Sequence, residues 1–237
     1  MKRAVEPELL DELAADDRRA RWSRRDLQRV NVLMGNARIA ARALGGVVPG
    51  GTPRSIVDLG AGDGTPLLRL ARKIGPRWKS VRAVLVDRRR LLSAETEAEF
   101  AALGWRVECV EMDALEWLGR ARAEKSDLTI ASLFLHHFKE DDLRKLLALA
   151  AHQTAMFLAC EPRRTNLTFC AASLLGFVGC NGVTRHDAKV SVRAGFAARE
   201  LSALWPAGDE WRLMERPAGL FSHCFVAQRI GETGNAS

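Results

Sequence analysis

The stretch Val57-Asp58-Leu59-Gly60-Ala61-Gly62-Asp63-Gly64-Thr65 decides the fold of this 237-residue chain. Its apolar beginning predicts a strand over residues 55–59, and the glycines that follow predict a tight turn into a helix. In open α/β sheets, ligands bind beyond the carboxyl ends of such strands. The stretch therefore predicts an α/β fold whose ligand site begins at this turn.

Short apolar runs and helical stretches alternate after the turn. Strands are predicted at residues 55–59, 81–87, 106–111, 127–132 and 155–160, with helices at 66–73, 91–103, 115–123, 141–151 and 197–204. Two last strands, 211–215 and 221–227, are joined by only five residues, which suits an antiparallel hairpin. We expect an α/β, Rossmann-like, seven-stranded and mostly parallel sheet with an antiparallel terminal hairpin and helices on both faces.

The amino-terminal part has a different pattern. Apolar residues recur at helical spacing over residues 6–45, and a glycine- and proline-rich segment then ends the pattern. The sequence predicts an N-terminal helical appendage at 1–50, one domain at 51–230 and a disordered tail at 231–237. The nearly continuous apolar run 167–179 predicts a buried helix, which packs in the core, lines an apolar acceptor pocket or forms a dimer contact.

The glycine spacing and the neighbouring acids indicate the ligand. Gly60, Gly62 and Gly64 form GxGxG, whereas dinucleotide loops read GxGxxG. Asp58 would repel a pyrophosphate and attract a ligand that carries an ammonium and a sulfonium. This favours S-adenosylmethionine over NAD as the cofactor. Asp87 ends the second strand, where a carboxylate can accept both ribose hydroxyls of either cofactor.

With these motifs, the chain resembles the class I S-adenosylmethionine-dependent methyltransferases over about residues 52–228. The matches are residues 58–64, Asp87, Met112-Asp113-Ala114, residues 132–138 and the reversed last strand. The resemblance implies a cofactor site made of Asp58, Gly60, Ala61, Gly62, Asp87, Arg88, Asp113, Ala114 and Ser132. It implies that Asp58 and Ser132 face the methionine end, and that Asp113 and Ala114 face the adenine.

A histidine pair follows the fourth strand. The segment Leu135-His136-His137-Phe138 is similar to the Leu-His-Asp-Trp segment of plant-type phenolic O-methyltransferases, whose histidine is the general base. That histidine maps onto His136, and His137 stands where those enzymes have aspartate. Imidazole suits the removal of a hydroxyl proton, because its pKa lies near neutrality. Three interpretations stay open: His136 as base, His137 as base, or a packing role for both.

Residues 181–196 lie where methyltransferases insert substrate-recognition elements. Arg185 and His186 are candidates for substrate binding, and His186 also for catalysis; alternatively Arg185 pairs with Asp187, and His186 caps a helix. Residues 27–36 resemble a helix of small bacterial methyltransferases encoded beside polyketide enzymes. This resemblance adds Arg29 and Asn31 to the substrate site and implies that residues 1–45 cover the cofactor as a lid. We expect O-methylation of a small aromatic or polyketide-like acceptor.

The net charge of +7 supports an alternative, an RNA methyltransferase or RNA-binding protein. A basic stretch surrounds Trp22 and consists of Arg18, Arg19, Arg21, Arg24, Arg25 and Arg29. Against this, Asp16 and Asp17 precede the arginines, and a solvated helix face explains the pattern equally well. No Asn/Asp-Pro-Pro-aromatic segment follows the fourth strand, which disfavours methylation of an exocyclic amine.

The cysteines indicate the compartment. Their number is five, and no pair has CxxC spacing, so we expect no metal cage, no disulfide framework and mostly buried free thiols. No signal core or membrane-spanning run stands out, and we expect a cytoplasmic protein. The sequence leaves the oligomeric state open, with a homodimer as one alternative.

Overall fold

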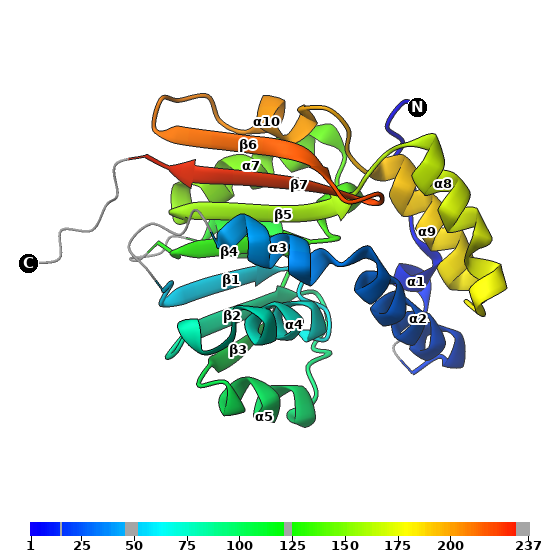
Figure 1. The fold of residues 1–237 in the computed structure, drawn as a ribbon, viewed down its shortest axis with the longest axis horizontal. Helices are drawn as coiled ribbons and strands as arrows, with labels where there is room; N and C mark the ends of the chain where they lie inside the picture. The colour runs from blue at the N-terminus through cyan, green and yellow to red at the C-terminus, as the bar shows by residue number, and fades with distance from the viewer. Residues whose placement is uncertain (15, 46–51, 121–124, 231–237) are drawn as a thin grey trace, which may run out of the picture.

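The computed structural model of the chain describes residues 1–14, 16–45, 52–120 and 125–230. Its centre is a seven-stranded sheet in the order β3-β2-β1-β4-β5-β7-β6 (Figure 1). The strands are β1 (Ser55–Leu59), β2 (Arg82–Asp87), β3 (Arg106–Glu111), β4 (Leu128–Ser132), β5 (Met156–Pro162), β6 (Trp211–Ala218) and β7 (Ser222–Arg229). β1 to β5 are parallel, and β7 runs antiparallel to both β5 and β6. The predicted Rossmann-like sheet with its terminal hairpin is confirmed.

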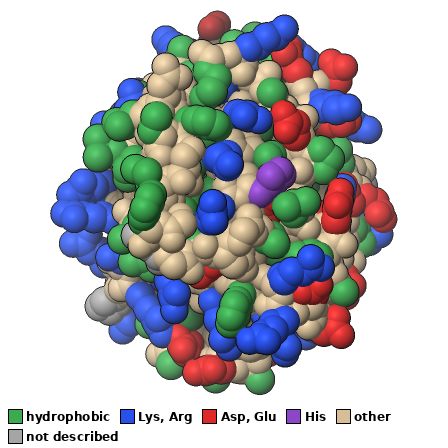
Figure 2. Space-filling model, turned by 90° about the vertical axis from the view of Figure 1, so that its right-hand side faces the viewer, with side chains coloured by type: hydrophobic (Ala, Val, Ile, Leu, Met, Phe, Trp, Pro, Cys, Tyr) green, Lys and Arg blue, Asp and Glu red, His purple; other side chains and the backbone are tan. Residues whose placement is uncertain are grey.

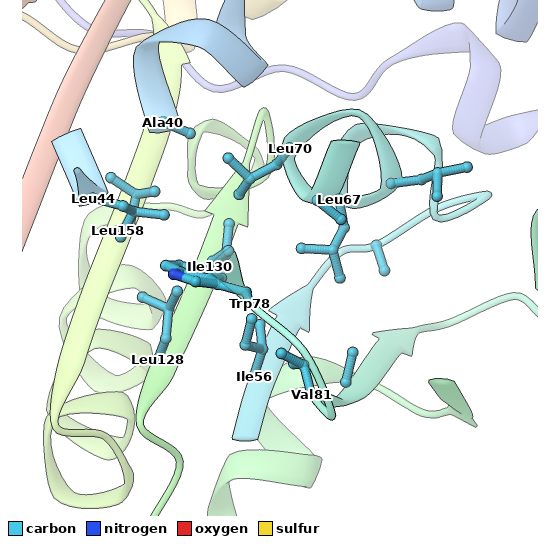
Figure 3. Packing of buried hydrophobic residues seen from close by; sticks show 14 of the residues in the cluster. Ala40, Leu44, Ile56, Leu67, Leu70, Trp78, Val81, Leu128, Ile130 and Leu158 are labelled. Atoms are coloured by element: carbon cyan, nitrogen blue, oxygen red, sulfur yellow. The ribbon is translucent and has the colours of Figure 1, made fainter. Parts of the chain in front are cut away.

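Helices cover both faces of the sheet. One face carries α3 (Asn36–Leu44), α4 (Thr65–Ile74) and α5 (Ala94–Ala102), and the other carries α6 (Ala114–Gly119), α7 (Glu140–Gln153) and α10 (Glu200–Leu204). The strands serve both layers because successive side chains point to opposite faces. In β5, for example, Leu158 packs toward α3 and α4, whereas Phe157 packs toward α7 and α10. Figure 3 shows Ala40, Leu67 and Leu70 standing over Ile130 and Leu158.

The remaining α-helices gather at the carboxyl ends of the parallel strands (Figure 1). They are α1 (Leu9–Glu12), α2 (Arg18–Met34), α8 (Asn166–Ser173) and α9 (Gly182–Ala194), together with the 3-10 helix η3 (Leu174–Val178). The first residues of the chain are fastened here: the Arg3 side chain donates to the Phe138 carbonyl at 2.9 Å, and the Asp187 carboxylate accepts from the N–H groups of Leu9 and Leu10. The amino-terminal segment thus lies across the edge where the glycine turn emerges.

The apolar run 167–179 is not a buried helix. Leu167, Leu174 and Phe177 have exposed fractions of 58%, 57% and 88%. The run forms α8 and η3, which pack on α9 with one side only, because they are the outermost layer at this edge. Cys170 is exposed for the same reason. All five cysteines are free, but only Cys160 and Cys224 are buried, which corrects the expectation of mostly buried thiols.

Several element boundaries differ from the prediction. The helix expected at 197–204 begins only at Glu200, since Ala198 has a φ of 51°. The helix expected at 115–123 is described to Gly119, and residues 121–124 lie outside the described part. The predicted tail 231–237 also lies outside it, and the predicted domain limits stay predictions. Within the described residues, no helix has the length and apolar character needed to cross a bilayer.

Two phenylalanines test this account of the core. Phe157 is fully buried between β7 and α10, whereas Phe177 is almost fully exposed. We expect Phe157→Ala to lower the free energy of unfolding by about 3–5 kcal/mol, since it leaves a cavity. We expect Phe177→Ala to change it by less than about 0.5 kcal/mol. Urea denaturation of both variants measures this, and equal losses would contradict the layer assignment.

Candidate functional site

The glycine turn after β1 is shaped by two positions. Gly60 has a φ of +68°, and a Cβ there would stand 2.1 Å from the Phe134 ring, so no other residue fits. Gly62 has a φ of +57° and faces open space. Its N–H donates to Asp87 Oδ2 at 2.8 Å, which ties the turn to the end of β2. The turn therefore leaves backbone that a ligand can approach closely.

Two carboxylates at this edge differ in charge state. Each oxygen of Asp87 accepts one backbone N–H, from Gly62 and from Arg89, and each has a further lone pair for a ligand hydroxyl. Asp58 is buried, and burial together with the charge of Asp87 raises the pKa of Asp58 to about 8. Asp58 is therefore mostly protonated at pH 7 and becomes ionised when a cation binds beside it.

Asp113 has a structural partner in addition to its predicted role. Its Oδ1 caps α6 by accepting from the N–H groups of Leu115 and Glu116, and its Oδ2 accepts from Arg88 Nε at 2.9 Å. Burial raises the pKa of Asp113, but the Arg88 hydrogen bond and the cap outweigh it and lower the pKa overall. The predicted cofactor residues Arg88 and Asp113 thus form a pair, next to the buried Ala114.

A cavity of about 530 Å³ lies between α3, α4 and the sheet, close to the end of β1. This volume is typical of small-molecule sites, which span roughly 300–1,000 Å³. The lining includes the predicted residues Asp58, Ser132 and Asn31. It also includes Asn36, Arg38, Ala40, Leu67, Arg69, Leu70, Lys73, Ile130 and Leu158. The lining of the cavity therefore contains a carboxyl group, apolar side chains and several side-chain hydrogen-bond donors.

His136 lies in the 3-10 helix η2 (Leu135–His137) and is buried between two acids. Its Nδ1 is 2.7 Å from Glu161 Oε2, and its Nε2 is 3.4 Å from Glu8 Oε1. Burial alone lowers the pKa of His136, but the hydrogen bonds to Glu161 and Glu8 outweigh it and raise the pKa to about 9. The same pairing lowers the pKa of the buried Glu8 to about 2. At neutral pH, His136 is therefore a cation with both ring nitrogens engaged.

His137 has a different environment. Its side chain is 31% exposed, its ring centroid lies 4.3 Å from that of His136 with the two rings tilted by 31°, and its Nδ1 is 3.9 Å from Asp11 Oδ2. Burial and the charge of His136 lower the pKa of His137, so the imidazole is neutral at pH 7. Glu8, His136 and His137 place three atoms of the metal-ligating kind within 4.8 Å of one another. Because Glu8 and His136 already engage these atoms with each other, we interpret the group as an ion-pair cluster.

One of the predicted substrate-binding residues lies at the cavity, and the other three lie on the exposed surface of α2 and α9. Asn31 lines the cavity, whereas Arg29 is exposed and lies 3.6 Å from Asp26. His186 is 47% exposed and lies 3.1 Å from Asp187 on α9. Arg185 is also exposed, and its guanidinium covers Gly176.

Neither structural alternative that the sequence left for α9 is observed. Asp187 binds the backbone of α1 instead of Arg185, and Asn181 instead of His186 caps α9. The roles predicted for Arg29, Arg185 and His186 stay predictions.

Sequence reasoning missed three residues of this edge. Glu161 carries a signal, since it is an acid inside an otherwise apolar strand; its carboxylate accepts from the N–H groups of Phe134 and Leu135 and binds His136. Glu8 and Asn36 carry no such signal, because their partners are more than 100 positions away.

The basic stretch lies on α2 and is partly neutralised there. Arg19 pairs with Asp17 at 2.9 Å, and the guanidinium of Arg18 covers the Trp22 ring at 4.9 Å. Figure 2 shows the face at the carboxyl ends of the strands, where Lys and Arg side chains lie among apolar and acidic ones. These contacts agree with a solvated helix face, and the RNA alternative stays a prediction.

Comparisons with known proteins agree with the geometry. Residues 56–155 match the methyltransferase domain family. No curated protein matches the chain in sequence. Among solved structures, the plantazolicin methyltransferase in complex with a desmethyl analogue and S-adenosylhomocysteine is 13% identical, with a TM-score of 0.63 over 93% of this chain and 94% of that one.

Two O-methyltransferase structures are similar over part of their length. The mitomycin 7-O-methyltransferase is 19% identical, with a TM-score of 0.60 over 93% of this chain and 60% of that one. An O-methyltransferase family protein from Burkholderia thailandensis is 18% identical, with a TM-score of 0.55 over 91% of this chain and 61% of that one. The chain thus spans about three fifths of the length of these two proteins, and the likeness shows the fold.

The burial of Asp58 predicts a pH-dependent cost in stability. Its pKa is about 8 in the folded chain against an ordinary 3.8, so unfolding releases a proton between these values, and stability falls as pH rises through this range. Asp58→Asn removes the titration. We expect the Tm difference between the variant and the wild type to grow from pH 5 to pH 8. Thermal denaturation measures this, with the exposed Asp142→Asn as control, and a difference independent of pH would refute it.

Proposed function

We propose that the chain is a class I S-adenosylmethionine-dependent methyltransferase that methylates a hydroxyl oxygen of a small aromatic or polyketide-like acceptor. The cavity beside the glycine turn is the main support for this proposal. Its volume suits a small molecule, and its lining combines the buried acid Asp58 with apolar side chains. The O-methyltransferases of similar fold include one named for mitomycin, and they support the acceptor class by analogy.

The residues at the turn fit the cofactor. Asp87 has one free lone pair on each oxygen for the two ribose hydroxyls, and Gly62 leaves its backbone open beside them. Asp58 and Ser132 line the cavity where the methionine end would enter. S-adenosylmethionine supplies an electrophilic methyl group and a sulfide leaving group. The chain's own task is to align the acceptor oxygen and to remove its proton.

We assign proton removal to His137 in preference to His136. His136 is a buried cation between Glu161 and Glu8 and has no free lone pair at neutral pH. His137 is neutral and partly exposed, and its ring lies beside Phe134, which packs on Gly60. Asp11 faces its Nδ1 and would stabilise the imidazolium that forms when the acceptor hydroxyl loses its proton.

Cofactor binding should release a proton from Asp58. The ammonium of the cofactor favours the ionised carboxylate, so a pKa of about 8 falls on binding, and affinity rises with pH toward 8. Calorimetry with S-adenosylhomocysteine at pH 7, in buffers of different ionisation enthalpy, measures the released protons. We expect wild type to release more protons than Asp58→Asn, and this variant to bind about 10–100-fold more weakly. Equal proton release would contradict the role of Asp58.

Replacing His137 tests the proposed base. We expect His137→Gln to lower kcat by roughly 10²–10⁴-fold, and the wild-type rate to fall at low pH only below the ordinary pKa of histidine, since burial lowers the pKa of His137. S-adenosylhomocysteine formation with a panel of phenols measures this. The exposed His152→Gln is the matched control. A His137→Gln enzyme with an unchanged rate and pH profile would reject the assignment.

A further inference from the structure

The helices at the carboxyl ends of the strands leave apolar surface uncovered. Ten large hydrophobic side chains are exposed in the described ranges, and six of them lie on α2, α8 and η3: Trp22, Val32, Leu33, Leu167, Leu174 and Phe177. The most exposed of the ten is Phe177, at 88%. Single exposed apolar residues are normal on a protein, whereas a group gathered on one edge indicates an interaction surface.

The elements that carry these residues are packed together with α9. We call α2, α8, η3 and α9 the carboxyl-edge layer, made of residues 18–34, 166–178 and 182–194. Ser23 of α2 shares a buried hydrogen bond of 2.9 Å with Thr184 of α9. Between η3 and α9, the N–H of Asn181 donates to Asp26 Oδ2 at 2.9 Å, and its side-chain amide donates to the carbonyl of Arg19 at 3.1 Å. The end of η3 is therefore held directly beside α2.

The exposed Lys, Arg, Asp and Glu side chains of this layer are all cationic. Its helices contain nine Lys and Arg residues but only two acids, Asp26 and Asp187, and both acids are buried. Asp26 accepts the N–H of Asn181, and Asp187 accepts two N–H groups of the amino-terminal segment. The acids are thus used in packing, and the outward surface of the layer complements an anionic partner.

Cations and exposed apolar side chains lie close together in the layer. The Arg185 guanidinium lies over Gly176, next to the exposed ring of Phe177. Arg21 and Arg25, four positions apart on α2, share a face of that helix, are exposed and form no ion pair with a residue in the described ranges. Figure 2 shows hydrophobic side chains gathered toward the left of this face with Lys and Arg beside them, whereas the acidic ones lie mainly toward the right.

We propose that the carboxyl-edge layer binds the surface of an anionic lipid bilayer, with Leu174 and Phe177 entering the interface and Arg21 and Arg25 facing the lipid phosphates. Surfaces that combine Lys and Arg with Trp, Phe and Leu bind such membranes, because apolar burial adds to attraction by anionic headgroups. RNA would use the arginines, but the exposed aliphatic side chains have no role with RNA, since they neither pair with phosphates nor stack on bases as aromatic rings do. None of these four residues lines the cavity, so the proposal is independent of the methyltransferase assignment.

The electrostatic part is tested by sedimentation of the full chain with lipid vesicles. We expect binding to vesicles of phosphatidylglycerol and phosphatidylcholine, and at least about 10-fold weaker binding to phosphatidylcholine alone. The double variant Arg21→Gln/Arg25→Gln should lower the partition coefficient on anionic vesicles by about 10–30-fold. The matched control is Arg106→Gln/Arg212→Gln, which removes two exposed arginines at the opposite edge of the sheet and should bind as the wild type does.

The apolar part is tested at Phe177, whose exposure leaves stability unchanged on substitution. We expect Phe177→Ala to lower the partition coefficient by about 10-fold, because the ring no longer enters the interface. Phe177→Trp should retain binding, since Trp favours this region of a bilayer. Ile230→Ala removes an exposed apolar side chain just after β7, at the opposite edge, and should have no effect. Thermal denaturation checks that each variant is folded.

Four results would overturn the proposal. The first is a wild type that does not bind anionic vesicles at low salt, and the second is unchanged binding by both Arg21→Gln/Arg25→Gln and Phe177→Ala. In the third, the wild type binds poly(U) RNA but no vesicles, and the layer is a nucleic-acid surface. In the fourth, the wild type is a dimer that Phe177→Ala dissociates in sedimentation velocity and vesicles are not bound, so the layer joins two copies of the chain.

Discussion

The buried carboxylate of Glu161 organises the loop that follows β4. It accepts from three backbone N–H groups, at Phe134, Leu135 and His136, and it is hydrogen-bonded to the ring of His136. These bonds set the Phe134 ring against Gly60, which makes glycine obligatory at that turn. They also direct the other nitrogen of His136 toward Glu8, so the amino-terminal segment is fastened to the same loop. One acid on β5 thereby couples the glycine turn, the histidine pair and the covering segment.

The aspartates at three successive strand ends differ in protonation and in hydrogen-bond partners, because their surroundings differ. Asp58 is enclosed and retains its proton, Asp87 is held by two backbone N–H groups, and Asp113 is neutralised by Arg88 while it caps a helix. The sequence identifies all three positions by their spacing from the strands. Their charge states depend on burial and on partners that only the folded chain brings together. The same argument separates His136 from its neighbour His137.

The sheet and the glycine turn could be predicted from local sequence patterns. Contacts between residues far apart in the chain could not, and they are seen only in the structure. The GxGxG stretch and the short link between the last two strands indicate their conformations from a few adjacent residues. The pairs Glu8–His136 and Asn36–Ser222 join residues far apart in the chain, and nothing in either neighbourhood points to the other. The exposure of Phe177 could not be predicted either, because the apolar character of the run 167–179 does not show whether another element packs over its outer side.

The bond between Asn36 and Ser222 bridges 186 positions along the chain. Ser222 opens β7, which enters the sheet between β5 and β6. The glycine turn and β1 to β5 all precede β7 in the chain, so they can pair before β7 is in place. The Asn36 side chain at the cavity is then held only after β7 has inserted, which ties the completion of the pocket to the closure of the sheet by its antiparallel strand.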